Sequence, residues 1–176
     1  WEEFRQRVRA VKSDAYIVGE IWHDAPEWLS GDRFDATMNY VFAAAAIAFA
    51  GGDHVSQNLV EDRSYEPYPG IDAPTFGKRI SALFGQYAWK TTQVQFNRLG
   101  SHDAPRVLSI ARGDWATLRR ATLLQMTFPG APSIYYSDEI ALRGTKRYDR
   151  PHRDQDARWP FPWHDESLWD QTTLND

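Results

Sequence analysis

Short apolar segments alternate with helix-forming segments along this chain, and this order limits its possible folds more than any other feature. The apolar segments are expected to form strands, at residues 15–19, 34–40, 94–97 and 133–136. Short strands that alternate with helices predict a parallel sheet with right-handed crossovers. An open doubly wound sheet and a closed (β/α) barrel both fit this order. Four strands in 176 residues would be an incomplete barrel, because a complete one typically needs roughly 250 residues.

Sequence patterns typical of helices occur before and between these apolar segments. Large apolar residues recur at helical spacing in residues 1–12 and again in residues 75–91. Residues 41–50 are rich in alanine, which has the highest helix propensity. Asp114 can cap the start of a helix that runs to about Met126. We therefore expect a helix in each of these places.

Two polar segments interrupt this pattern within a chain that is expected to form one domain over residues 1–176, since domains usually have about 100–200 residues. Residues 53–74 carry several prolines and many polar side chains, which predicts a loop insertion. Residues 143–176 are rich in Arg, Asp, Trp and Pro, which predicts loops and short helical turns.

Composition excludes several classes of function. No apolar run reaches the roughly 18 residues that a membrane span needs. A net charge of −4 argues against a nucleic-acid partner, because phosphate binding needs a basic patch. The chain has no cysteine, which excludes disulfides and thiol chemistry. The charged N-terminus lacks the apolar core of a signal peptide, which favours the cytoplasm over secretion, although a chain that starts within a longer protein would look the same.

Carboxylates gather where the expected strands end. In open sheets and in barrels alike, functional sites form at the carboxyl ends of the strands. The four ends carry Glu20, Asn39, His102-Asp103 and Asp138-Glu139. A buried carboxylate costs several kcal/mol unless it is paired or functional. These ends are therefore the candidate site.

Glu20 has the surroundings of a general acid. It follows an apolar strand directly and precedes Ile21 and Trp22. Apolar surroundings raise the pKa of a carboxyl group, which keeps a proton available near neutral pH. A group that protonates a leaving oxygen needs such a proton. A glutamate that caps the following helix or forms a salt bridge is the alternative, and the residues alone leave both open.

The pair His102-Asp103 can bind hydroxyl groups, because a neutral histidine beside a carboxylate offers both a donor and an acceptor. Its alternative is a loop in which Asp103 caps the next segment and Pro105 starts it. The histidines and aspartates show no recognised zinc spacing. No glycine-rich phosphate motif and no GxSxG elbow is present. We therefore expect no metal and no cofactor in this chain.

Several segments in succession resemble glycoside hydrolase family 13, the α-amylase family. Residues 19–25 resemble the fifth-strand motif of that family, whose glutamate is the acid/base. Residues 34–40 resemble the sixth-strand segment of its neopullulanase and cyclomaltodextrinase branch. Residues 99–106 and 127–140 resemble the seventh-strand motif and the eighth-strand segment, and residues 158–163 a loop near the substrate cleft. Among the departures, Ser137 stands where the family usually has glycine.

The resemblance implies the C-terminal half of a (β/α)8 TIM barrel, with strands 5 to 8 and their helices, left incomplete in this chain. It implies a retaining α-glycoside hydrolase that acts on α-1,4-glucans, cyclodextrins or maltooligosaccharides. Glu20 would be the acid/base, and Asp103 with His102 would bind ring hydroxyls and stabilise the transition state. The nucleophilic aspartate belongs to a fourth-strand motif that would precede Trp1. The chain alone is therefore expected to be inert.

The resemblance also implies substrate contacts and partners. The substrate-binding residues would be Trp22, His23, Asn39, Arg106 and Trp163. The expected partners are an α-glucan or maltooligosaccharide and the missing N-terminal half of the barrel, with neither nucleic acid nor membrane. Without that half, exposed strand edges are expected to cause dimerisation or aggregation. Calcium would belong to the full-length parent.

A non-catalytic α-amylase-like binding domain is the alternative function. Such a domain keeps the barrel for binding or interaction and has no need of an acid/base. The presence of Glu20 together with His102-Asp103 argues against it.

Overall fold

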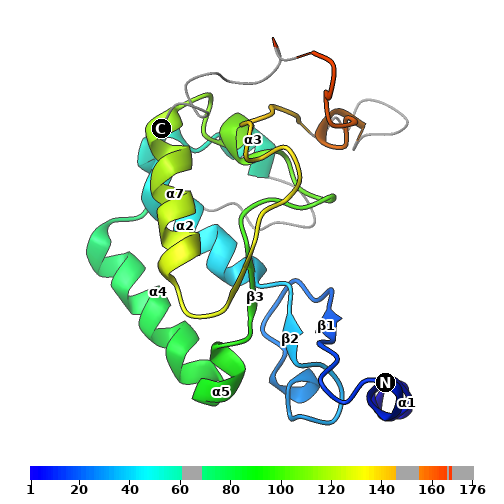
Figure 1. The fold of residues 1–176 in the computed structure, drawn as a ribbon. Coiled ribbons are helices and arrows are strands. Elements are labelled where there is room, and N and C mark those ends of the chain that lie inside the picture. The colour runs from blue at the N-terminus through cyan, green and yellow to red at the C-terminus, as the bar shows by residue number, and fades with distance from the viewer. Residues whose placement is uncertain (61–68, 146–154, 166, 168–176) are drawn as a thin grey trace.

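The computed structural model of the chain describes residues 1–60, 69–145, 155–165 and 167 (Figure 1). Its elements are α1 (Glu2–Val11), β1 (Val18–Gly19), the 3-10 helix η1 (Pro26–Trp28), β2 (Ala36–Thr37), α2 (Tyr40–Gly51), the 3-10 helix η2 (Gly52–His54), α3 (Gln57–Val60), α4 (Ala73–Gln86), α5 (Trp89–Thr92), β3 (Phe96–Arg98), α6 (Val107–Ile110), α7 (Trp115–Thr127), β4 (Ala131–Ser133) and the 3-10 helix η3 (Gln155–Ala157). Strands and helices alternate, as the apolar pattern predicts.

The strands pair in parallel. Val18 of β1 lies opposite Ala36 of β2, and Phe96 of β3 lies opposite Ala131 of β4. A parallel bridge between Met38 and Phe96 joins the two pairs. The strands therefore follow one another across the layer in chain order, and their carboxyl ends share one edge. Within the described residues the layer does not close into a barrel.

The fourth strand lies earlier than expected. It was predicted at residues 133–136, where β-branched and aromatic residues favour a strand, but it spans Ala131–Ser133. Ile134 is half exposed instead. The rings of Tyr135 and Tyr136 pack on the buried Arg106 guanidinium, at 4.3 and 4.6 Å. Packing on this guanidinium, rather than local propensity, decides where the chain leaves the sheet.

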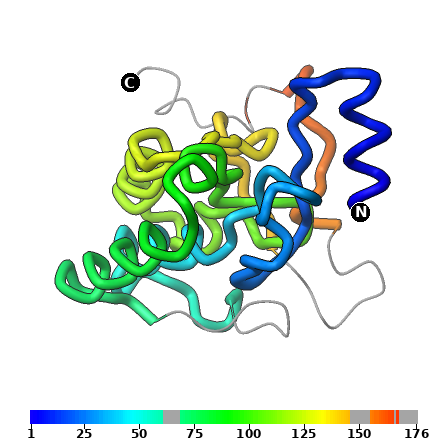
Figure 2. Tube along the Cα trace, turned by 90° about the horizontal axis from the view of Figure 1, so that it is seen from below, coloured from blue at the N-terminus to red at the C-terminus, as the bar shows by residue number. Residues whose placement is uncertain are grey.

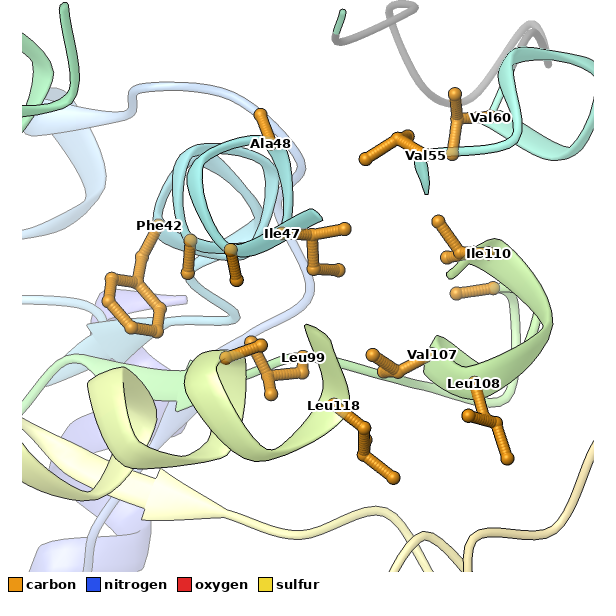
Figure 3. Close-up of a cluster of buried hydrophobic side chains, with 14 of the residues drawn as sticks. Phe42, Ile47, Ala48, Val55, Val60, Leu99, Val107, Leu108, Ile110 and Leu118 are labelled. Atoms are coloured by element: carbon orange, nitrogen blue, oxygen red, sulfur yellow. The ribbon is translucent and has the colours of Figure 1, made fainter. Parts of the chain in front are cut away.

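Helix α2 is the centre of the core. Its alanine-rich sequence is buried on nearly all sides, because it lies between the strands and helices α4 and α7. Figure 3 shows Phe42 and Ile47 of α2 facing Leu99, Val107 and residues of α6 and α7. The small alanine side chains let these neighbours approach closely.

Helix α7 starts as predicted. The carboxylate of Asp114 accepts hydrogen bonds from the backbone amides of Ala116 and Thr117. The helix predicted over residues 75–91 is divided, because Tyr87 adopts extended backbone after α4 and a separate short helix, α5, follows. The predicted loop over 53–74 includes α3, while residues 61–68 lie outside the described residues.

Helix α1 lies apart from the main core, on the other side of the β1–β2 pair from α2, α4 and α7 (Figures 1 and 2). Ion pairs hold it there. Arg5 and Arg9 both lie 2.8 Å from an oxygen of Asp35, whose other oxygen accepts from the Ile17 amide at 2.9 Å. In the described part of the chain, every helix is too short or too polar to cross a membrane.

Gly130 allows β4 to approach β3. Its φ is +142°, and a Cβ at this position would lie 2.2 Å from the Asn97 Nδ2 atom. We expect Gly130→Ala to lower the free energy of unfolding by on the order of 2–3 kcal/mol, because both the backbone and the contact become strained. Urea denaturation of the chain measures this. Gly77→Ala is the matched control: open space surrounds Gly77 in α4, so stability should stay equal or rise. Equal stability of both variants would contradict the close approach.

Candidate functional site

Glu20 stands at the carboxyl end of β1. The preceding Gly19 lets the Phe34 ring approach closely, since a Cβ there would lie 2.6 Å from a ring carbon. The Glu20 side chain is 44% exposed. The apolar enclosure expected around this carboxylate is thus not formed by the described residues, and the carboxylate remains accessible to water and substrate.

His102 and Asp103 lie in the loop after β3. The Ser101 hydroxyl, which is buried, accepts from the Asp103 amide at 3.2 Å and shares a hydrogen bond with the Tyr40 hydroxyl. Asp103 does not cap α6, whose N-cap residue is Arg106 and makes no side-chain cap bond. The loop is therefore held by Ser101, which leaves the Asp103 carboxylate available for other contacts.

The structure brings these side chains together. His102 Nε2 lies 3.4 Å from Glu20 Oε1 and 3.3 Å from Asp103 Oδ2. One ligand atom from each of the three residues lies within 4.8 Å of the other two. An imidazole between two carboxylates can bind hydroxyl groups, move a proton or hold a cation. Geometry alone leaves these three uses open.

Arg158, which the sequence did not single out as a site residue, completes the cluster. Its Nη2 lies 2.5 Å from Asp103 Oδ1, and its Nε donates to the His102 carbonyl at 2.6 Å. This arginine lies 55 residues beyond Asp103 in an irregular segment. Only the resemblance of residues 158–163 to a cleft loop pointed toward it.

An open groove of about 820 Å³ begins at Glu20. It is lined by Trp1, by Phe4 and Val8 of α1, by the β1 residues, and by Trp22 and His23. The side chains of the groove are largely apolar and aromatic. Among the described strands β1 pairs only with β2, so the groove follows the unpaired edge of β1.

Of the other expected substrate-binding residues, Asn39 and Arg106 make contacts within the fold and Trp163 is largely exposed. Asn39 caps α2 by accepting from the Phe42 amide and donates to Asn97 at 2.8 Å. Arg106 is fully buried and donates to the carbonyls of Ala157 and Tyr136. Trp163 is 72% exposed and its ring packs on Phe161. Asn39 and Arg106 thus make hydrogen bonds that support the fold. Their positions near strand ends in the sequence do not reveal these partners.

Asp138 is the buried partner of Arg106. The two groups are 3.1 Å apart. Burial raises the pKa of Asp138 to about 6, against the opposing effect of the Arg106 charge. The fourth strand end therefore supports the fold, and the exposed Glu139 beside it also stands outside the cluster.

The raised pKa of Asp138 predicts a pH dependence. The unfolded chain ionises this carboxyl near pH 3.8, while the folded chain retains the proton until about pH 6. The folded state therefore loses stability as pH rises between these values, by on the order of 2–3 kcal/mol. Asp138→Asn removes this loss, so the variant should gain stability relative to the parent chain from pH 4 to 7. Urea denaturation across that range measures the gain, with Glu139→Gln as control. If the stability of Asp138→Asn falls relative to the parent chain as pH rises, the ion pair with Arg106 outweighs the cost of burying the Asp138 charge.

The model of the α-amylase catalytic domain family matches residues 1–172. The chain belongs to the α-amylase family. The catalytic domain of this family is a TIM barrel. The parallel α/β layer described above is therefore part of such a barrel. The family membership that the strand-end motifs predicted is confirmed.

This α-amylase family chain is 43% identical to a cyclomaltodextrinase of Geobacillus thermopakistaniensis over 82% of its own length and 22% of that protein. It is 39% identical to neopullulanase 2 of Thermoactinomyces vulgaris over 94% of its length and 24% of that protein. Among solved structures, the debranching enzyme of Nostoc punctiforme matches 99% of the chain and 34% of its own chain, with 45% identity and a TM-score of 0.88. The chain thus spans about a fifth to a third of these relatives.

Proposed function

We propose that this chain supplies the acid/base and the transition-state-binding groups of a retaining α-glucan hydrolase. One observation carries the proposal: Glu20 and the pair His102-Asp103 gather at the carboxyl ends of β1 and β3, with His102 Nε2 3.3–3.4 Å from both carboxylates. In a TIM barrel this end of the strands holds the active site. We infer that β1 to β4 are strands 5 to 8 of the barrel and that residues 1–176 belong to one catalytic domain.

Glu20 would act as acid and then as base. Its exposed carboxyl group can protonate the departing glycosidic oxygen and afterwards accept a proton from an incoming water. His102, at 3.4 Å, can bind a sugar hydroxyl beside it. Trp22 and His23 follow the acid in the loop after β1 and would face the leaving-group side.

Asp103 would stabilise the transition state. The sugar ring becomes positively charged as it flattens, and a fixed carboxylate lowers the energy of that charge. His102 and Arg158 contact different oxygens of Asp103, which holds the carboxylate in one orientation. A contact that strengthens in the transition state raises kcat more than it lowers KM.

The nucleophile would come from a part of the catalytic domain that this chain does not cover. A retaining enzyme needs a second carboxylate about 5–5.5 Å from the acid. In the described residues, Asp103 is the carboxylate that gathers with Glu20 and His102, and Arg158 already engages it. The solved relative extends well beyond the matched segment, which makes up 34% of its chain. That remainder can supply an attacking carboxylate.

The remaining part of the barrel would dock on the open strand edges. The groove beside β1 offers an unpaired edge together with apolar side chains such as Phe4 and Trp28. Beyond β4, Ile134 and Tyr136 are partly exposed. Covering these edges would bury apolar surface and satisfy strand hydrogen bonds. If this partner were absent, the same edges would favour self-association.

The proposed substrates are α-glucans and maltooligosaccharides. The relatives carry the names cyclomaltodextrinase, neopullulanase and maltogenic α-amylase. Cyclodextrins, pullulan and short maltooligosaccharides are therefore the substrates to assay first.

A chimera tests the proposal. In the Nostoc punctiforme debranching enzyme, this chain replaces the segment that it matches, and purified protein is assayed for sugar release from maltotetraose, β-cyclodextrin and pullulan. We expect hydrolysis by the chimera and none by the 176-residue chain alone. A folded chimera that binds sugar without hydrolysing it would contradict the proposal and favour a non-catalytic binding domain. Hydrolysis by the isolated chain would place a nucleophile within it.

A further inference from the structure

Arg98, in β3, is a charged group buried without a hydrogen-bond partner. Its side chain is 1% exposed. Within the described part of the chain, Nε, Nη1 and Nη2 are all buried and lack a hydrogen-bond partner. A buried cation of this kind is unfavourable unless other contacts offset its lost hydration. A leucine or methionine would fill the same space without that penalty, so the guanidinium calls for a specific explanation.

Two interactions offset the lost hydration: the nearby Asp138 carboxylate, whose pKa the Arg98 charge lowers, and an aromatic stack. The guanidinium carbon of Arg98 lies 3.0 Å from the centroid of the Tyr40 ring. The Trp22 ring stacks on Tyr40 with centroids 3.7 Å apart and an interplanar angle of 18°. Arg98 is 5.9 Å from the Trp22 centroid, so the Tyr40 ring lies between the other two groups. Cation–π attraction favours this order, because a ring face carries partial negative charge.

The stack touches both loops of the candidate site. Trp22 is two residues beyond Glu20, in the loop that follows β1. The Tyr40 hydroxyl shares a hydrogen bond with the Ser101 hydroxyl at 3.2 Å, and Ser101 accepts from the Asp103 amide. The Tyr40 ring thus contacts Trp22, in the loop that carries Glu20, through its face, and the His102-Asp103 loop through its hydroxyl.

We propose that Arg98 and Tyr40 form a positioning unit that sets the distance between Glu20 and the pair His102-Asp103. Arg98 packs on the face of the Tyr40 ring and restricts its position. The ring in turn fixes the loop that carries Glu20 relative to the loop that carries His102 and Asp103. Neither residue is expected to touch the sugar. This inference rests on the proposed function for its purpose, but its geometry can be tested without any turnover.

The test uses NMR of the chimera with labelled histidine, because the chain alone is expected to self-associate. His102 Nε2 lies 3.4 Å from the Glu20 carboxylate, so Glu20→Gln should shift the His102 ring resonance. In an Arg98→Met background, which keeps a long apolar side chain but removes the cation, we expect Glu20→Gln to lose most of this effect. Arg79→Met is the matched control, because Arg79 is an exposed arginine on α4, and it should leave the Glu20→Gln shift unchanged.

Tyr40→Phe provides a second arm should Arg98→Met fail to fold. It keeps the ring and removes the hydroxyl that contacts Ser101, so it too should reduce the Glu20→Gln shift at His102. A full shift in folded Arg98→Met, or in Tyr40→Phe when Arg98→Met is unfolded, would overturn the inference. If Glu20→Gln causes no His102 shift in the chimera that keeps Arg98 and Tyr40, both this inference and the site geometry are overturned. An inactive chimera with the expected NMR pattern would instead reject the proposed function alone.

Discussion

Glu20→Gln in the chimera should lower turnover of maltotetraose by about 10²–10⁴-fold, the usual contribution of a general acid or base. Glutamine is nearly isosteric and still accepts a hydrogen bond, but it cannot give a proton to the leaving oxygen. The exposed position of Glu20, 3.4 Å from His102, leaves its carboxyl group free to reach that oxygen. KM should change little, since the lost interaction belongs to the transition state.

A substrate with a good leaving group separates acid catalysis from a binding defect. α-Maltosyl fluoride needs little protonation to depart, so the first step, measured as the rate of the initial burst of fluoride release, should suffer far less in Glu20→Gln than hydrolysis of maltotetraose, although the later base-assisted step stays slow. Glu27→Gln is the matched control, since Glu27 is an exposed carboxylate on η1 in the same loop region. A fluoride burst slowed as much as maltotetraose hydrolysis would show that Glu20 is not the acid.

Asp103→Asn should lower kcat by about 10²–10³-fold, the range seen when a group that stabilises transition-state charge is removed. The asparagine can keep the contact with Arg158 through its carbonyl oxygen, but it no longer carries the charge that opposes the oxocarbenium ion. Steady-state kinetics of the chimera measures this loss. Asp24→Asn, at another exposed carboxylate beyond β1, is the control. A rise in KM with unchanged kcat would restrict Asp103 to ground-state binding.

The gathering of the candidate site residues could be predicted because parallel strands place their carboxyl ends on one edge. Glu20 and His102-Asp103 are far apart in the sequence, yet β1 and β3 deliver them to the same edge. This follows from alternating strands and helices, without knowledge of side-chain contacts. The cap of α7 by Asp114 was equally predictable, because it depends only on neighbouring residues.

Features set by distant packing could not be anticipated. Arg106 stands in a motif that points to substrate, yet Asp138 and the Tyr136 carbonyl draw it into the interior. Tyr135 and Tyr136 read as strand residues but leave the sheet to cover that arginine. Periodicity records which residues are apolar and not which partner each polar group finds, so these roles appear only in three dimensions.

Arg98 and Arg158 have roles that sequence reasoning did not predict. Sequence reasoning gave Arg98 no role, and only the resemblance of residues 158–163 to a cleft loop pointed toward Arg158. Their importance comes from contacts made across long sequence separations, with Tyr40 for Arg98 and with Asp103 for Arg158. A buried or site-facing arginine becomes visible only once its neighbours are known.

The most direct test is a crystal structure of the chimera carrying Glu20→Gln, soaked with maltohexaose. We expect one glucose ring beside Asp103 and His102, with its hydroxyls bound by that pair and its glycosidic oxygen within hydrogen-bond distance of residue 20. A sugar bound elsewhere, with residue 20 and Asp103 on different sides of it or out of reach, would contradict the assignment of this cluster as the site of glycosidic bond cleavage.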